Sequence, residues 1–182
     1  MKSLFVKYKS VIVFLLLFLG SYLVLSFLYA GYLTISEDTR YQPDFVTNLV
    51  AKQSSSIMNG MGYQAEVIPH KNQPSLELFV NGKYLARVVE GCNALSIIIL
   101  FISFIVAFAQ GFKKTMLFIL AGIVLIYSVN IIRIAILALA LYHYPMQEHI
   151  LHGVVFPAII YGMVFLLWVL WVRMLTPKKM RL

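Results

Sequence analysis

The chain has one cysteine and few charged residues. Cys92 is its only thiol, and charged residues make up 12% of the 182 positions. A single cysteine excludes an internal disulfide framework and a CxxC redox or zinc motif. Soluble domains have about 25% charged residues. The low charge content, together with 61% hydrophobic residues, indicates an integral membrane protein.

Several common catalytic motifs are also missing. The sequence has no GxSxG, HExxH, P-loop or paired-carboxylate motif. The net charge of +8 does not indicate a nucleic-acid surface, because the basic residues are spread among loops between apolar runs. We therefore predict no nucleic-acid partner and no bound cofactor, and we look for chemistry at the membrane.

Four apolar runs are long enough to suggest membrane spans, since roughly 20 residues cross a bilayer as a helix. The runs are Val11–Leu33, Asn93–Gln110, Thr115–Tyr142 and His149–Val172. The first run exceeds the apolar core of a signal peptide, about 7–15 residues, and is predicted to be a retained helix. The sequence thus predicts an all-α membrane protein built as a four-transmembrane-helix bundle.

A polar segment, residues 36–90, separates the first two runs. Within it, Pro43–Met58 has the signals of a short helix. Residues 75–80 and 83–88 alternate in polarity on either side of Asn81-Gly82, which is a strong hairpin signal. The segment is predicted to form a small α+β extracytoplasmic loop.

Charge predicts the orientation and, with the runs above, the domain boundaries. The N-terminus, the Lys113-Lys114 loop and the C-terminal tail carry basic residues and none of the seven acidic ones. Cytoplasmic flanks collect Lys and Arg, so we expect both termini in the cytoplasm. The predicted parts are an N-terminal transmembrane helix at 1–35, the extracytoplasmic loop at 36–90, a three-helix core at 91–175 and a basic cytoplasmic tail at 176–182.

Three polar features are predicted to lie at the same outer edge of the membrane. Arg133 follows Thr115 by 18 residues, roughly 27 Å of helix, in a hydrocarbon core of about 30 Å. Cys92 begins the span that descends from outside, and His149 begins the last span. A thiol, a guanidinium and an imidazole from three helices are therefore expected at similar depth.

The three groups suit acyl transfer by a cysteine nucleophile. A neighbouring cation favours the reactive thiolate, a histidine can take and return the proton, and an arginine can stabilise an oxyanion. Arg133 shares a helical stripe with Tyr127 and Asn130, which favours a role inside the bundle.

Each of these groups could also have a role without chemistry. Cys92 alone would be a small buried hydrophobe, and Arg133 alone would snorkel to the interface. His149 and His152 share a helix face, and either could be the active histidine. Both could also be interfacial, or form a metal site with the cysteine.

Three motifs together resemble the exosortase/archaeosortase family. They are Cys92 at the start of a span, Asn130-Ile131-Ile132-Arg133, and His149-Ile150-Leu151-His152-Gly153. The Glu-Gly-Cys-Asn setting of Cys92 resembles the exosortase F subfamily of Bacteroidetes. Many members of the family have Cys-Ser-Gly at the nucleophile, where this chain has Cys92-Asn93-Ala94.

The resemblance implies a membrane-embedded cysteine transpeptidase or protease of the bacterial inner membrane, with its active site facing the periplasm. Its partners would be exported proteins with a C-terminal transmembrane sorting signal, besides the lipid bilayer and possible membrane partner proteins. Cys92 would be the nucleophile, Arg133 the charge-stabilising group, and His149, or else His152, the proton carrier. The alternative function is a non-enzymatic scaffold or assembly factor that acts through the extracytoplasmic loop.

Overall fold

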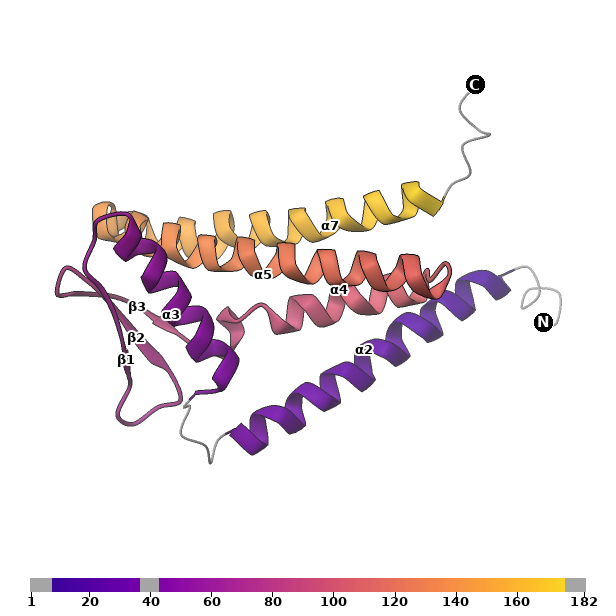
Figure 1. The fold of residues 1–182 in the computed structure, drawn as a ribbon, viewed down its shortest axis with the longest axis horizontal. Coiled ribbons are helices and arrows are strands. Elements are labelled where there is room, and N and C mark those ends of the chain that lie inside the picture. Colours follow the sequence, from indigo (N-terminus) through magenta and orange to yellow (C-terminus); the bar gives the residue numbers. More distant parts are fainter. Residues whose placement is uncertain (1–7, 37–42, 176–182) are drawn as a thin grey trace, which may run out of the picture.

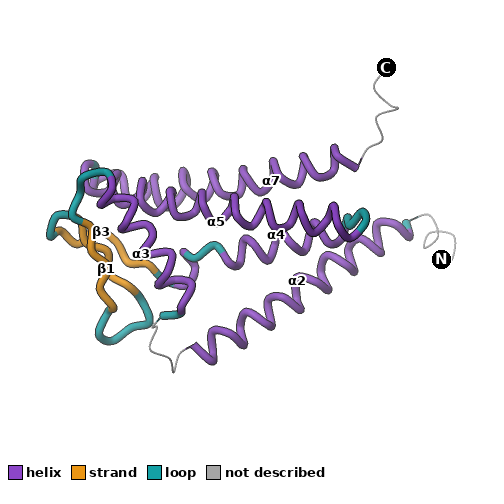
Figure 2. Tube along the Cα trace, in the orientation of Figure 1, coloured by secondary structure: helices purple, strands orange, loops and turns teal. Residues whose placement is uncertain are grey.

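The computed structural model describes residues 8–36 and 43–175, which are mainly helical (Figures 1 and 2). The helices are α2 (Lys9–Ser36), α3 (Phe45–Gly60), α4 (Leu95–Ala107), α5 (Phe112–His143), α6 (Glu148–Ile150) and α7 (Phe156–Leu175); the strands are β1 (Ala65–Pro69), β2 (Leu76–Val80) and β3 (Lys83–Val88). The long helices run along the molecule, and α3 and the sheet lie together at one end. We call α3 and the three strands the cap, and we call the end of each long helix that lies nearer to the cap its outer end.

Among the described residues, three helices are long and apolar enough to cross a membrane: Lys9–Ser36, Phe112–His143 and Gly153–Met174. The predicted span 93–110 contains instead the 13-residue helix α4, which rises only about 20 Å. The helix begins two residues later than predicted because the chain turns at Ala94, whose φ of 64° is left-handed, and it ends three residues earlier, at Ala107, where Phe108 leaves the helical conformation. The prediction of four spanning helices is therefore not confirmed.

The cap contains one strand more than predicted. Asp44 accepts hydrogen bonds from the amides of Val46 and Thr47 and so fixes the start of α3 at Phe45. The strands form an antiparallel sheet in the order β1-β2-β3. Asn81 and Gly82, with φ of 50° and 75°, make the tight turn between β2 and β3. Strand β1 ends at Pro69, which an edge strand tolerates.

Helix α5 belongs to both the cap and the bundle. Its outer part places Ala135, Ala138 and Leu139 in one core cluster with residues of α3 and all three strands. Its inner part packs on α4 and α7 through a second cluster. The cap is therefore fixed to the bundle by a continuous helix.

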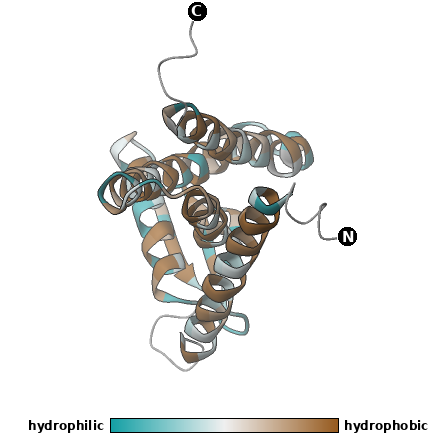
Figure 3. Cartoon of the chain, turned by 90° about the vertical axis from the view of Figure 1, so that its right-hand side faces the viewer, coloured by the Kyte–Doolittle hydropathy of each residue, from teal (hydrophilic) through white to brown (hydrophobic). Residues whose placement is uncertain are grey.

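The surface of the bundle is apolar, as expected for contact with lipid. Figure 3 shows the helices coloured mostly as hydrophobic residues. Large exposed side chains include Leu16, Phe27 and Leu166. In α2, no residue of the most apolar 18-residue window is buried, so this helix is the one most open to its surroundings.

The last helix does not begin as a regular α-helix. Residues Leu151–Val155 form a π-helical turn, in which the Phe156 amide donates to the Leu151 carbonyl. Pro157 follows, and a proline ring clashes with the carbonyl four residues earlier in a regular helix. The wider turn relieves that clash.

We expect Gly122→Ala to destabilise the bundle. A Cβ on Gly122 would lie 2.2 Å from the ring of Phe101, which is fully buried. Overpacking of this kind costs about 1–3 kcal/mol. Thermal unfolding in detergent should show a lower Tm for Gly122→Ala than for Gly162→Ala, since Gly162 has open space around it. Equal Tm values would contradict the tight contact.

Candidate active site

Cys92 lies in a turn between the cap and the bundle. Residues Glu90–Cys92 form a single 3-10 turn, and the Cys92 amide donates to the Val89 carbonyl at 2.8 Å. The thiol is free and half-buried. Strand β3 therefore leads within four residues to the candidate nucleophile.

Helix α5 holds this turn and carries the cation beside it. The side-chain amide of Asn130, which is buried, donates to the Cys92 carbonyl at 2.7 Å. One turn further along, Arg133 lies close enough to Cys92 for the two side chains to interact electrostatically. The structure thus brings together Cys92 and Arg133, two of the residues predicted from the sequence to form the site. The Asn-x-x-Arg spacing allows one helix face to hold the Cys92 turn and to carry the cation.

The guanidinium of Arg133 has an unused donor. Its Nε is buried and has no hydrogen-bond partner among the described residues. Buried donors are nearly always paired, and an unpaired one costs roughly 1–3 kcal/mol. A donor kept free beside a thiol is what a transient oxyanion or a carbonyl oxygen of a bound substrate would use.

The site lies about one bilayer thickness from the first residue of α5, measured along that helix. Asn130 follows Phe112, the first residue of α5, by 18 positions, or about 27 Å. Because Asn130 contacts Cys92, the thiol lies at the same level. The rest of α5 extends about 20 Å further, into the cap.

The two histidines are placed differently. His149 is exposed, in the one-turn helix α6. Helix α5 continues ten residues past Arg133 before the chain turns back, so His149 lies on the order of 10 Å nearer the outer end. No hydrogen bond joins His149 to Cys92 or Arg133 within the described residues. The side chain of His152 lies outside the described part of the structure.

Two residues near the site were not singled out from the sequence. Tyr161 of α7 interacts electrostatically with Arg133. Little in the sequence indicates this interaction, because a single tyrosine in an apolar span is common. Asn93 is buried directly after Cys92. As for metals, no group of three or more His, Cys, Asp or Glu that could hold an ion occurs in residues 8–36 and 43–175.

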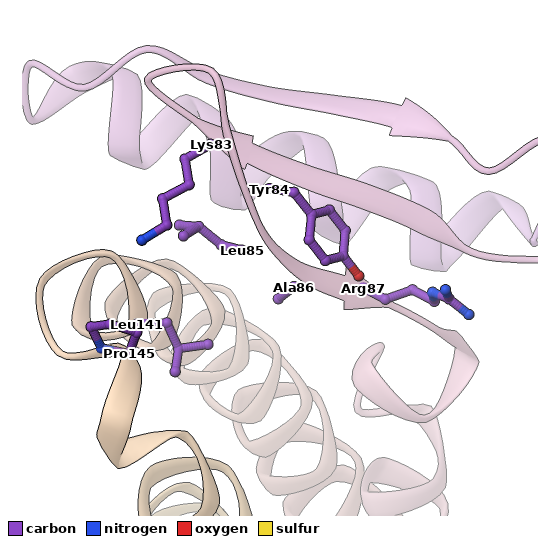
Figure 4. Close-up of a pocket in the computed structure, with 7 residues that line it drawn as sticks. All are labelled: Lys83, Tyr84, Leu85, Ala86, Arg87, Leu141 and Pro145. Atoms are coloured by element: carbon purple, nitrogen blue, oxygen red, sulfur yellow. The ribbon is translucent and has the colours of Figure 1, made fainter.

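A cleft lies between the edge strand β3 and the outer end of α5 (Figure 4). Its volume is about 490 Å³, and it is lined by Lys83, Tyr84, Leu85, Ala86, Arg87, Leu141 and Pro145. The lining has two cationic side chains and no acidic one. Leu141 is 11 residues beyond Asn130 along α5, or roughly 16 Å, and Arg87 precedes Cys92 by five residues.

Comparison with known families gives a match over nearly the whole chain. Residues 7–174 match the family described as transmembrane exosortase, Exosortase_EpsH. No curated protein and no solved structure matches. The family match spans the bundle, the cap, Cys92 and Arg133. The chain therefore belongs to the transmembrane exosortase family.

Proposed function

We propose that the protein is a cysteine transpeptidase or protease that cleaves the C-terminal sorting signals of exported proteins just outside the membrane. The observation that carries the proposal is the buried, unpaired Nε of half-buried Arg133, whose side chain interacts electrostatically with the free thiol of Cys92. The motifs around Cys92 support placement in the F subfamily.

The chemistry proceeds through a thioester. The Cys92 sulfur attacks the carbonyl carbon of the substrate peptide bond, and its proton passes to the active histidine. Arg133 donates to the oxyanion of the tetrahedral intermediate. The C–N bond then breaks, and the leaving amine takes the proton from the histidine. An amine acceptor or water attacks the thioester, releases the acyl product and restores the thiol.

The deciding experiment uses a tagged exported protein that ends in an apolar helix followed by basic residues. Cells carrying the wild-type chain or Cys92→Ala are compared for cleavage of the tag. An uncleaved substrate in the variant supports the proposal. Unchanged cleavage would overturn it.

We assign the proton transfer to His149, with His152 as the alternative. His149 lies in the one-turn helix α6, and His152 lies in the π-helical turn Leu151–Val155. Such π-helical turns are frequent at functional sites. We expect either His149→Gln or His152→Gln to lower kcat by about 10²–10⁴-fold, and the other to keep most of the activity. Single-turnover cleavage rates identify the residue, and full activity in both variants would exclude a histidine.

The proposed topology has four crossings, with both termini in the cytoplasm and the site facing the periplasm of a bacterial inner membrane. Helix α4 is short, but with its flanking turns it covers the same depth as Phe112–Asn130, because Cys92 contacts Asn130. Basic residues on the cytoplasmic flanks support the orientation.

We propose that the cleft beside β3 receives the substrate segment that precedes its membrane anchor. Roughly five extended residues would cover the 16 Å from the level of Leu141 to the level of Asn130 and the thiol. Since Lys83 and Arg87 line the cleft, acidic side chains in that segment would be complementary to it.

Reversing the charge of the cleft should weaken substrate binding. We expect Lys83→Glu with Arg87→Glu to raise KM about tenfold with a small change in kcat, because the acidic segment would be repelled. The matched control is Lys52→Glu with Lys71→Glu, which makes the same charge change at two exposed sites of the cap and its loops. Equal effects on KM from the two pairs would contradict binding in the cleft.

The cleft also suits the non-enzymatic alternative, an assembly factor that binds its partner through the cap. The two functions differ in their need for the thiol. An assembly factor would keep its function in Cys92→Ser and lose it in the cleft variant.

A further inference from the structure

We propose that Asn93, Thr47 and Asp44 form a polar clamp that positions Cys92 beside Arg133. The clamp extends to α2, so this helix would be part of the active site as well as a membrane anchor. The inference rests on the proposed function for its catalytic meaning. Its geometric basis is a set of hydrogen bonds around the turn that holds the thiol.

Asn93 is fixed on both sides of its side-chain amide. It is 1% exposed, and its Nδ2 donates to the hydroxyls of Thr47 at 3.1 Å and Tyr29 at 3.0 Å. Its Oδ1 accepts from the Leu95 amide at 2.9 Å, the first amide of α4. The amide therefore uses both its donors and one acceptor, and the direction of the chain after Cys92 is set by that side chain.

Thr47 transmits the restraint to a buried carboxylate. Its hydroxyl has one proton, which it donates to Asp44 Oδ2, so it can only accept from Asn93. Asp44 Oδ1 also accepts from the amides of Val46 and Thr47 and, at 3.2 Å, from the Tyr32 hydroxyl. Asp44 and Thr47 are both fully buried. Charge-assisted bonds in such a setting are strong and directional.

The clamp joins three segments that are distant in sequence. Tyr29 and Tyr32 come from the outer end of α2, Asp44 and Thr47 from the start of α3, and Asn93 from the turn after β3. On the other side of the same turn, Asn130 of α5 holds the Cys92 carbonyl. Two side-chain amides thus position the Cys92 turn. Asn130 of α5 bonds to the Cys92 carbonyl, and Asn93 bonds to side chains of α2 and α3.

This arrangement should affect rate more than substrate affinity. A misplacement of about 1 Å in an active site can cost 10²-fold in rate. Among the described residues, the side-chain hydrogen bonds of Asn93, Thr47 and Asp44 go neither to the residues that line the cleft nor to Arg133. Asn93, Thr47 and Asp44 are accordingly positioning residues, which act through the Cys92 turn.

The test compares Thr47→Val, Thr47→Ser and the control Ser54→Ala in the purified full chain. Valine keeps the shape and removes the hydroxyl, whereas serine restores it. Ser54 is another fully buried hydroxyl of α3, bonded to the carbonyls of Val50 and Ile131 and not to the clamp. Three readouts are measured: Tm, kcat and KM on a cleaved substrate, and the rate of Cys92 alkylation by N-ethylmaleimide.

We expect Thr47→Val to lower kcat at least about tenfold with KM within twofold, and to change the alkylation rate. Thr47→Ser should restore the wild-type kcat and alkylation rate. Ser54→Ala should leave kcat and the alkylation rate unchanged, even where it lowers Tm. If Thr47→Val fails to fold, Tyr29→Phe, which removes one bond to Asn93, gives the same comparison. Wild-type kcat and alkylation in both Thr47→Val and Tyr29→Phe would overturn the clamp.

Failure of the clamp and failure of the proposed function give different results. Alkylation needs only the thiol and reports the position of Cys92 without any substrate. An altered alkylation rate in Thr47→Val, together with normal processing by Cys92→Ala, would leave the clamp in place and remove the cysteine chemistry. The reverse pattern, with no change in Thr47→Val and no processing by Cys92→Ala, would remove only the clamp.

Discussion

Cys92→Ala is expected to reduce cleavage of a sorting-signal substrate by roughly a thousandfold or more, because the covalent route has no other nucleophile. Cys92 is the single thiol of the chain, so no second cysteine can replace it. The substitution removes one atom from a half-buried side chain and leaves the Asn130 bond to the Cys92 backbone carbonyl. The protein should therefore still insert and fold.

The measurement is the fraction of tagged substrate cleaved over time, with the amount of enzyme in the membrane fraction determined in the same samples. Ser96→Ala is the matched control, since it removes one atom from an exposed side chain in the first turn of α4. Full activity in Ser96→Ala with none in Cys92→Ala would assign the loss to the thiol. Equal rates in Cys92→Ala and the wild type would exclude a cysteine nucleophile.

Much of the fold follows from local sequence patterns. The turn at Asn81-Gly82 and the alternation around it predict β2 and β3, because that pair favours a two-residue hairpin. The apolar run from Thr115 to Tyr142 predicts nearly the whole of α5. Strand β1 has no such signal. Its five residues end at a proline, and they form a strand only through pairing with β2.

The late start of helix α4 has a tertiary reason. The run from Asn93 onward is apolar in composition, and composition alone predicts a helix that starts directly after Cys92. The left-handed conformation of Ala94 and the bonds of Asn93 interrupt it. Such contacts come from residues more than 40 positions away, and no local pattern reveals them.

Residue counting places Arg133 along the bundle more directly than it places His149. Arg133 lies on a continuous helix, so a fixed rise per residue gives its depth. His149 follows a turn whose height depends on where α5 ends, and α5 continues into the cap to pack on the sheet. The apolar boundary at His149 in the sequence therefore does not by itself give the position of this residue along the bundle.

Arg133 offers the second large effect, and the identity of the substitution matters. Arg133→Lys keeps the positive charge but loses the planar group and its Nε donor. Because the unpaired Nε is the donor available to an oxyanion, we expect even this variant to lose about 10²–10³-fold in kcat, the typical effect of removing one oxyanion donor. Arg133→Gln removes the charge as well and should lose more.

Single-turnover cleavage rates and KM separate this role from a structural one. Loss of an interaction made only in the transition state lowers kcat and kcat/KM together and leaves KM nearly unchanged. The matched control is Arg173→Gln, an exposed arginine in the last turn of α7, which should keep wild-type rates. A guanidinium that merely snorkels to the interface would be replaceable by lysine. Wild-type kcat in Arg133→Lys would therefore contradict a specific role for the guanidinium and its Nε donor, because lysine keeps the charge and offers only ammonium donors in another geometry.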